Sequence, residues 1–291
     1  MTRRTLLAAT IALALTATRS FAQSEATFDK TLTFSGAPTV NLSTGSGYIH
    51  VTPGPDNQFH IIGHVRANKG WLPTDDADAR VKQIAANPPI TQSGTTITVA
   101  VPHDSQELFN NISIDYDVTT PRTTTLTAHT GSGNITADSL GPNSRFGSGS
   151  GSIHATHIAG PATLETGSGS IELSLSGPGD LKVHTGSGSI HVDGLAGALQ
   201  AGTGSGTIEI AGSPTADWRL STGSGGIRLK LPNNSHFNFD ASTGSGSIHV
   251  DQPILMQGTL NRHHVSGTVN GGGPAVRAST GSGSVTVNGG A

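Results

Sequence analysis

Thr243-Gly-Ser-Gly-Ser-Ile-His-Val250 is one copy of a phrase that recurs along most of this 291-residue chain. We call this phrase the tag. Its other copies, intact or with a few changes, are Thr44–Val51, Thr130–Ala137, Thr166–Leu173, Thr185–Val192, Thr203–Ile210, Thr222–Leu229 and Thr280–Val287. From residue 131 onward the first glycine of each Gly-Ser-Gly returns at steps of 18, 18, 19, 18, 19, 21 and 37 residues. Such a fixed period is typical of a solenoid, in which successive coils stack on one another.

The residues around one tag predict the course of one coil. Gly-Ser-Gly forms a tight turn, because glycine adopts positive φ at little steric cost. The alternation that follows indicates a strand with Ile190 and Val192 inward. A turn at Asp193-Gly194 then precedes a second strand over 198–203. Since no coil buries its apolar face alone, the expected fold is an all-β, single-chain β-solenoid, β-helix-like, with stacked coils of about 18–21 residues.

The segment before the regular repeat has a different pattern. Around the early tag at Thr44 the sequence predicts longer strands, at Phe28–Phe34, Phe59–Val65, Thr95–Val101 and Ile112–Val118. One short helix is expected near 74–86, with Thr74 as its N-cap. We therefore expect residues 24–125 to form an N-terminal β cap or first layers, which cover the open end of the repeat solenoid at 126–291.

The first 22 residues are predicted to be an export signal. Arg3 and Arg4 precede an apolar run over 6–17 that is too short to span a bilayer, and small residues favour cleavage after Ala22. General secretion is favoured, although the paired arginines also resemble a twin-arginine signal. The chain has no cysteine, which excludes disulfides and a lipoprotein anchor. We expect a periplasmic or secreted protein without a membrane span in the mature chain.

Composition excludes some classes of partner. The net charge is −3 and only 12% of the residues are charged, so no basic patch predicts nucleic-acid binding. With 40 glycines and 33% hydrophobic residues, composition alone is typical of disorder. The regular return of Ile, Val or Leu after each turn argues against it, because a flexible linker has no such period. No cofactor is indicated.

One position in the tag varies, and it predicts an outward column on the coils. The residue after the central Ile is, in order, Thr136, His154, Glu172, His191, Glu209, Arg228 and His249. Two interpretations are open. Alternating His and Glu are suitable metal ligands, so His154, Glu172, His191, Glu209 and His249 are candidates for a metal ladder. The favoured interpretation is a solvated β face on which opposite charges alternate, with no metal.

Two further features are candidates for chemistry. The tag threonines are interpreted as an inward hydroxyl ladder that satisfies backbone groups of the turns, with ice or carbohydrate binding as the alternative. His263 and His264 lie in the last 37-residue step, within a degenerate copy of the tag at 264–269. This is the predicted place for an irregular coil and a local binding site.

A catalytic site is not indicated by the sequence. Gly-Ser-Gly resembles a nucleophile elbow or a phosphate loop, but both motifs require a helix after the turn, whereas the tags lead into strands. A catalytic serine would also not be repeated in every coil. The glycine-rich turns lack the Asp that calcium-binding β-rolls require. No dense cluster of carboxylates suggests a sugar-cleaving enzyme.

Tags such as Thr166–Leu173 and Thr185–Val192 resemble the bacterial candidate-adhesin β-solenoid family, whose function is unknown. The resemblance covers residues 28–287. It implies an exported or envelope-associated protein, with a strand-rich first part followed by glycine-serine coils, and it transfers no functional residues.

The resulting hypothesis is an exported, non-enzymatic β-solenoid that acts as an adhesin or as a module binding a cell-envelope glycan or protein. The alternatives are a carbohydrate-active β-helix enzyme and a periplasmic structural or signalling partner.

Overall fold

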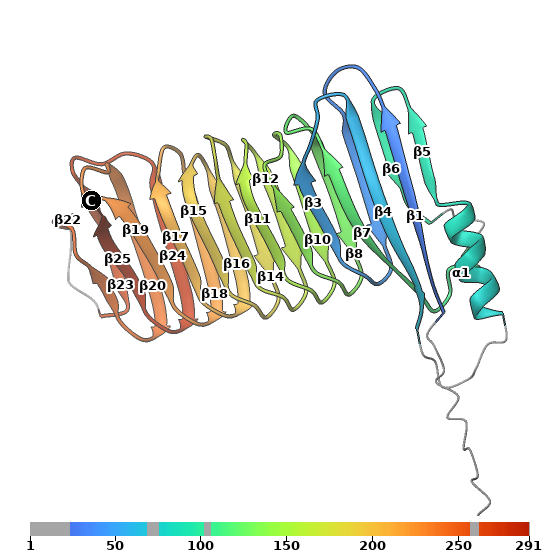
Figure 1. Ribbon diagram of the computed structural model, residues 1–291. Helices are drawn as coiled ribbons and strands as arrows, with labels where there is room; N and C mark the ends of the chain where they lie inside the picture. Colours follow the sequence, from blue (N-terminus) through green and yellow to red (C-terminus); the bar gives the residue numbers. More distant parts are fainter. Residues whose placement is uncertain (1–23, 69–75, 102–105, 257–261, 291) are drawn as a thin grey trace, which may run out of the picture.

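The computed structural model describes residues 24–68, 76–101, 106–256 and 262–290. Within these ranges the chain forms two long β-sheets that line an elongated stack, with one helix at the N-terminal end (Figure 1). The predicted all-β solenoid is confirmed. The predicted export signal lies outside the described residues. No helix in the described ranges is long and apolar enough to cross a bilayer.

The spatial order of the strands follows the sequence in the middle of both sheets and departs from it near the ends. From one edge to the other, the first sheet contains β1 (Glu25–Thr33), β4 (Gln58–Ala67), β7 (Ile112–Thr120), β3 (Ile49–Pro53), β9 (Ile135–Asp138), β11 (Ile153–Ile158), β13 (Ile171–Leu175), β15 (Ile190–Ala196), β17 (Ile208–Ser213), β19 (Ile227–Pro232), β25 (Val285–Gly290) and β21 (Ile248–Val250). The second sheet contains β22 (Ile254–Met256), β23 (His264–Val269), β20 (Phe237–Ser245), β24 (Ala275–Ser282), β18 (Trp218–Ser224), β16 (Leu199–Ser205), β14 (Leu181–Thr185), β12 (Ala162–Thr166), β10 (Ser144–Ser148), β8 (Thr125–Thr130), β2 (Thr39–Thr44), β6 (Thr96–Val99) and β5 (Ile90–Ser93).

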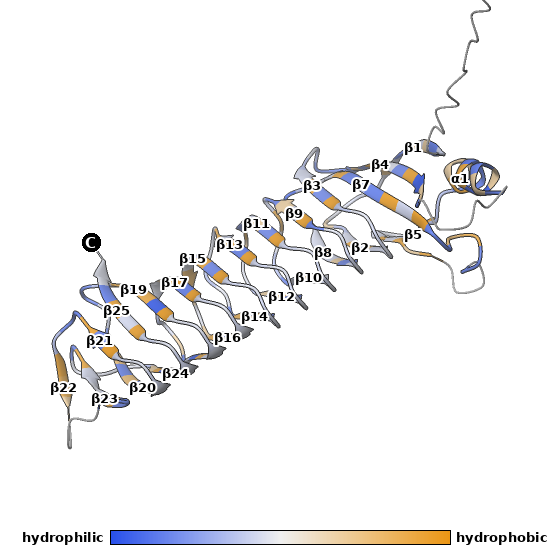
Figure 2. Cartoon of the chain, turned by 90° about the horizontal axis from the view of Figure 1, so that it is seen from below, coloured by the Kyte–Doolittle hydropathy of each residue, from blue (hydrophilic) through white to orange (hydrophobic). Residues whose placement is uncertain are grey.

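Each coil consists of a strand of the second sheet, a Gly-Ser-Gly turn and a strand of the first sheet. Neighbouring coils pair in parallel with equivalent residues in register. Hydrophobic and hydrophilic residues alternate along the strands (Figure 2). Ile190 and Val192 are buried, as predicted. At Asp193-Gly194, where a turn was predicted, β15 continues to Ala196 through a bulge: its pairing with β17 shifts after Val192, and Gly194 has a φ of 77°.

The tag threonines form the predicted inward ladder. The buried Thr185 hydroxyl donates to the Gly169 carbonyl oxygen of the preceding coil at 2.8 Å and accepts the Gly188 N–H of its own turn at 3.1 Å. Hydroxyls at the equivalent position donate in the same way to glycine carbonyls, from Thr130, Ser148, Thr166, Thr203, Thr222, Thr243 and Thr280. One hydroxyl per coil thus satisfies buried backbone groups that would otherwise destabilise the turn.

The tag glycines are required mainly by close approach of the coils. A Cβ on Gly186 would overlap the carbonyl oxygen of Gly167, and a Cβ on Gly188 would overlap that of Gly169. Neither Gly186 nor Gly188 has a positive φ. The expectation that glycine serves conformational freedom is therefore wrong for this coil: its turns stack too closely for any side chain.

The N-terminal end departs from the sequential order of the coils. The coil β2–β3 stacks on β8–β9, while β7 covers β3 and pairs antiparallel with β4, which pairs with β1. β1, β4 and β7 match three of the four longer strands predicted from sequence, whereas the strand predicted at Thr95–Val101 is shorter, as β6. Helix α1 (Ala77–Ala86) begins after Asp76, later than predicted, and Thr74 lies outside the described residues. Val81 and Ile84 of this helix are buried, and the helix packs on β1 and β4.

The C-terminal end contains a second departure. The last coil, β24–β25, lies between β18–β19 and β20–β21, and is parallel to both neighbours. The predicted degenerate coil at 264–269 is wrong, because β23 runs antiparallel to β20 and forms part of the edge with β22. Buried Trp218, Val276 and Phe239 lie in register across the inserted coil. The core of this end is therefore larger in side-chain volume than that of the regular coils.

A candidate binding face on the second sheet

Two rows of outward residues run across the strands of the second sheet. The first row holds the residues three positions before each tag threonine or its equivalent, in spatial order Arg145, Thr163, Lys182, Gln200, Arg219, Arg277 and Asp240. We call its cations, Arg145, Lys182, Arg219 and Arg277, the basic row. Because side chains alternate between the faces of a strand, this row and the inward threonine ladder are set by the same pattern.

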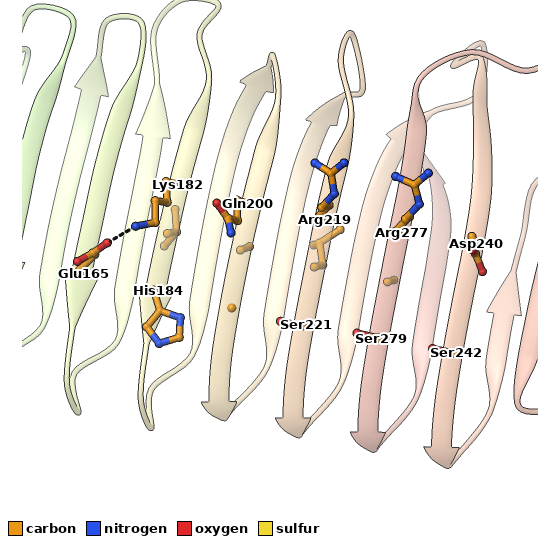
Figure 3. Close-up of a pocket in the computed structure, with 15 residues that line it drawn as sticks. Glu165, Lys182, His184, Gln200, Arg219, Ser221, Asp240, Ser242, Arg277 and Ser279 are labelled. Atoms are coloured by element: carbon orange, nitrogen blue, oxygen red, sulfur yellow. Dashed lines mark hydrogen bonds and ion pairs between the residues drawn. The ribbon is translucent and has the colours of Figure 1, made fainter.

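The second outward row is small over four strands. Gly202, Ser221, Ser279 and Ser242 are neighbours in register, one residue before their tag threonines. Together with the first row they line a shallow hollow of about 700 Å³ (Figure 3). A second hollow of about 420 Å³ adjoins it and shares Lys182, Gln200 and Arg219. The two hollows form a groove that crosses the strands and follows the axis of the stack.

The charges along the groove are partly compensated. Lys182 Nζ donates to Glu165 Oε1 at 2.7 Å, and this hydrogen bond holds the pKa of the Glu165 carboxyl below its usual range. Asp217 Oδ2 lies 3.9 Å from Arg219 and 3.9 Å from Arg277. The other oxygen of Asp217 accepts the Ala275 N–H at 2.9 Å, so this carboxylate also holds the start of the inserted strand β24.

Two arginines face each other directly in the middle of this face. Arg219 of β18 and Arg277 of β24 are partners in register, and their side chains are 63% and 51% exposed. Like charges directly opposite in a sheet are destabilising. In Figure 3 the strand with Arg277 lies between those carrying Arg219 and Asp240, although it follows both in sequence.

The predicted column of alternating His and Glu lies on the outer face of the first sheet, away from the groove. Its residues are in register from Thr136 to Arg228, but Thr286 of the inserted coil lies between Arg228 and His249. The structure brings His154 and Glu172 together, with Nδ1 and Oε2 3.0 Å apart.

The remaining members of the column pair mostly with other residues. His191 Nε2 is 2.9 Å from Asp193 and its Nδ1 is 3.9 Å from Glu209. Lys230 donates to Glu209 at 2.6 Å and lowers the pKa of that carboxyl. His249 is 2.6 Å from Asp251. Across the described ranges, no group of three or more His, Asp or Glu side chains could hold a metal ion.

The two histidines predicted as a local irregularity lie at the end of the stack. The carbonyl oxygen of His263 accepts the Thr243 N–H at 2.9 Å. His264 is the first residue of β23, and its Nε2 is 3.7 Å from Asp240 Oδ1. His264 therefore borders the outward rows of the second sheet, whereas the His and Glu column lies on the other sheet.

Sequence reasoning missed the basic row. The signal was present three residues before Ser148, Thr185, Thr222 and Thr280, where Arg145, Lys182, Arg219 and Arg277 stand. Alignment of the residues that follow the central Ile revealed the first sheet alone. The neighbourhood of Arg219 and Arg277 carried no sequence signal, because it depends on where the last coil inserts.

Several known proteins share features with this chain. The profile of the Toastrack DUF4097 family matches residues 71–288. Among solved structures, a candidate adhesin from Bacteroides fragilis is similar at 11% identity and a TM-score of 0.38, over 90% of this chain and 97% of that chain. A candidate cell adhesion protein from Clostridium sporogenes is similar at 13% identity and a TM-score of 0.27, over 90% of this chain and 98% of that chain. A search of curated proteins finds no relative.

Proposed function

The chain belongs to the Toastrack DUF4097 family, and from that premise we propose that it is an exported, non-catalytic adhesin-like module. In this proposal the outer face of its second sheet binds an extended glycan of the cell envelope. The export signal predicted over residues 1–22 supports the location, in the periplasm or outside the cell.

The continuous groove on the second sheet is the observation that carries the proposal. Its two hollows share Lys182, Gln200 and Arg219 and cross several parallel strands. Strands in a sheet lie about 4.8 Å apart, so equivalent side chains are presented at a regular spacing along the stack. Such a row suits a polymer that repeats along its length. Guanidinium, amide and hydroxyl groups are the donors and acceptors that a sugar chain requires.

The carboxylates of this face favour binding over hydrolysis. Glycoside hydrolases place two carboxyl groups roughly 5 to 10 Å apart, one of them protonated. Glu165 is held ionised by Lys182, and Asp240 lies five strands away, about 24 Å at the usual strand spacing. Asp180 accepts the N–H of Ala198, directly before β16, and Asp217 accepts the N–H of Ala275 at the start of β24, which is a structural role.

The test compares variants of the two sheets. The chain from Gln23 onward is assayed against purified envelope polysaccharides and cell-wall fragments by sedimentation and calorimetry. Ser221→Trp fills the hollow from an exposed position, and Glu172→Trp is the matched control on the outer face of the first sheet. We expect Ser221→Trp to abolish binding and Glu172→Trp to retain it. Equal loss in both folded variants, or no binding by the unmodified chain, would overturn the proposal.

A further inference from the structure

We propose that Arg219 and Arg277 form a subsite for an oxyanion, a carboxylate or sulfate group carried by the bound polysaccharide. This inference rests on the proposed function and specifies its ligand. It concerns one pair of adjacent strands, β18 and β24, in the middle of the groove.

The two guanidinium groups are available for a ligand. Both side chains are more than half exposed and both line the larger hollow. Their shared neighbour Asp217 lies 3.9 Å from each, which is longer than a hydrogen bond. Guanidinium forks bind carboxylate and sulfate-like oxyanions through paired, charge-assisted hydrogen bonds. An oxyanion between Arg219 and Arg277 would receive donors from both sides.

The carboxylates beside Arg219 and Arg277 lie 3.9 Å away or are turned toward another partner. Lys182 is paired with Glu165, whereas Arg219 and Arg277 share the single carboxylate of Asp217. Asp240, the register partner of Arg277 on β20, lies 3.7 Å from His264 on its other side. Like charges opposite each other destabilise a sheet, and a bound oxyanion would remove that repulsion.

Hydroxyl groups continue the subsite into the next row. Ser221 and Ser279 lie two residues beyond the arginines on the same strands and are partners in register, with Ser242 beside them. All three line the larger hollow. A sugar whose acidic group meets the arginines would have its ring hydroxyls over these serines, which both donate and accept hydrogen bonds.

The out-of-order insertion of the last coil creates this arrangement. If the coils stacked in sequence order, β20 would follow β18 and Asp240 would face Arg219, an ordinary pair of opposite charges. The inserted β24 places Arg277 and Ser279 between them instead. The fold thus separates Arg219 from Asp240 and sets a second cation, Arg277, between them, at the place where the surface is hollow.

The test uses three polymers of different charge. Binding of polygalacturonate, dextran sulfate and neutral dextran is measured by calorimetry with the unmodified chain, Arg219→Gln, Arg277→Gln and the double variant. Arg228→Gln, an exposed arginine on the first sheet, is the matched control. We expect an acidic polymer to bind more tightly than dextran. Each subsite variant should weaken that binding about tenfold, as for one hydrogen bond to a charged group, while Arg228→Gln changes nothing.

Each outcome decides between the two proposals. A preference for polygalacturonate or for dextran sulfate identifies the oxyanion as carboxylate or sulfate. If dextran binds as tightly as the acidic polymers and the arginine variants change neither, the subsite is wrong and the glycan-binding groove stands. If no polysaccharide binds to the folded chain, the proposed function fails and the subsite with it. Circular dichroism melting confirms that every variant is folded.

Discussion

The interior coils and the two ends of the stack are built on different rules. From β8 to β19 each coil stacks on the one before it in sequence, with equivalent residues in register. At the ends the order changes. At the N-terminal end β7 covers the first coil, and at the C-terminal end the last coil lies between the two coils that precede it in sequence. A repeat can propagate without limit, whereas an end must close strand edges that would otherwise pair with another molecule. The ends therefore abandon the repeat.

The N-terminal end shows how an open turn is closed without another tag. Tyr48, in the first tag, donates its backbone N–H to Asp115 of β7 at 2.9 Å. Asp115 is buried and forms an ion pair with Arg66 of β4. The Thr44 hydroxyl donates to the Ile114 carbonyl oxygen at 3.0 Å, as the other threonines donate to a glycine. The Asp115 carboxylate and the backbone of β7 thus accept the hydrogen bonds that another coil would otherwise accept from the first tag.

Removing a coil should be tolerated in the interior and not at the C-terminal end, and this is the largest difference that we expect. Deletion of residues 181–198 removes β14 and β15 and joins Asp180 to Leu199, which occupies the register position of Leu181. The shortened stack should fold with reduced stability. Truncation after Pro274 removes β24–β25 and leaves β18–β19 and β20–β21 without their shared neighbour. That chain should lose cooperative unfolding and aggregate.

Chemical denaturation and light scattering measure both variants. Deletion of a complete internal coil is the matched control for length, because it removes a similar number of residues from the stack. A truncated chain that unfolds as cooperatively as the internal deletion would show that the inserted coil is an ordinary repeat.

Glycine-to-alanine substitutions in the tag turns test the same difference between the interior coils and the N-terminal end. A Cβ on Gly131 would overlap the carbonyl oxygen of Gly45, whereas nothing lies within 4 Å of a Cβ on Gly45 itself. Both are the first glycine of a tag. Gly131→Ala should lower the free energy of unfolding by about 3 kcal/mol, the upper part of the usual range for overpacking. Gly45→Ala should leave it nearly unchanged. Equal effects in urea denaturation would mean that the turns do not stack as closely as the structure shows.

The hydroxyl ladder gives a smaller effect in the interior. Thr185→Val keeps the shape of the side chain but removes the hydrogen bonds to Gly169 and Gly188. Two buried backbone groups then lose their partner, and we expect a loss of about 2 kcal/mol in the free energy of unfolding. Thr163→Val, on the outward face of β12, is the control and should be close to neutral. A neutral Thr185→Val variant would remove the ladder from the account of stability.

The extent to which sequence predicts this molecule follows the same division. Ile190, Val192 and Thr185 could be assigned inward because each tag repeats their pattern in register with its neighbours. The neighbour of Arg228 could not be assigned, because β21 and β25 carry equivalent tags and both fit the same place. Local patterns determine a coil, while the choice among equivalent coils is made by the packing at the end of the stack.

The candidate site divides in the same way. The basic row could have been found from sequence, since Lys182 and Arg219 occupy the same position relative to their tags. The contact between Arg219 and Arg277 could not, because it joins strands that are distant in sequence and depends on the insertion. The hollow beside them requires small residues in register on four strands, which also depends on that order.

The smallest expected effect concerns acid stability of the interior coils. Asp138 of β9 is contacted by His157 Nδ1 at 2.8 Å and by the Thr156 hydroxyl at 2.7 Å. These contacts, His157 first, lower the pKa of Asp138 from 3.8 to about 2. A carboxyl whose pKa is lower in the folded state stabilises the fold above its unfolded pKa, and this stabilisation is lost as pH falls through the folded pKa. The contribution should be complete above pH 3.8 and absent near pH 2. Since Asp138 is partly exposed, we expect this carboxyl to contribute less than about 1 kcal/mol to the free energy of unfolding.

Asp138→Asn should therefore flatten the fall in melting temperature across this window, and His157→Phe should give part of the same change. Parallel melting curves for Asp138→Asn and the unmodified chain between pH 4 and pH 2 would show that this corner of the coil contributes nothing to acid stability.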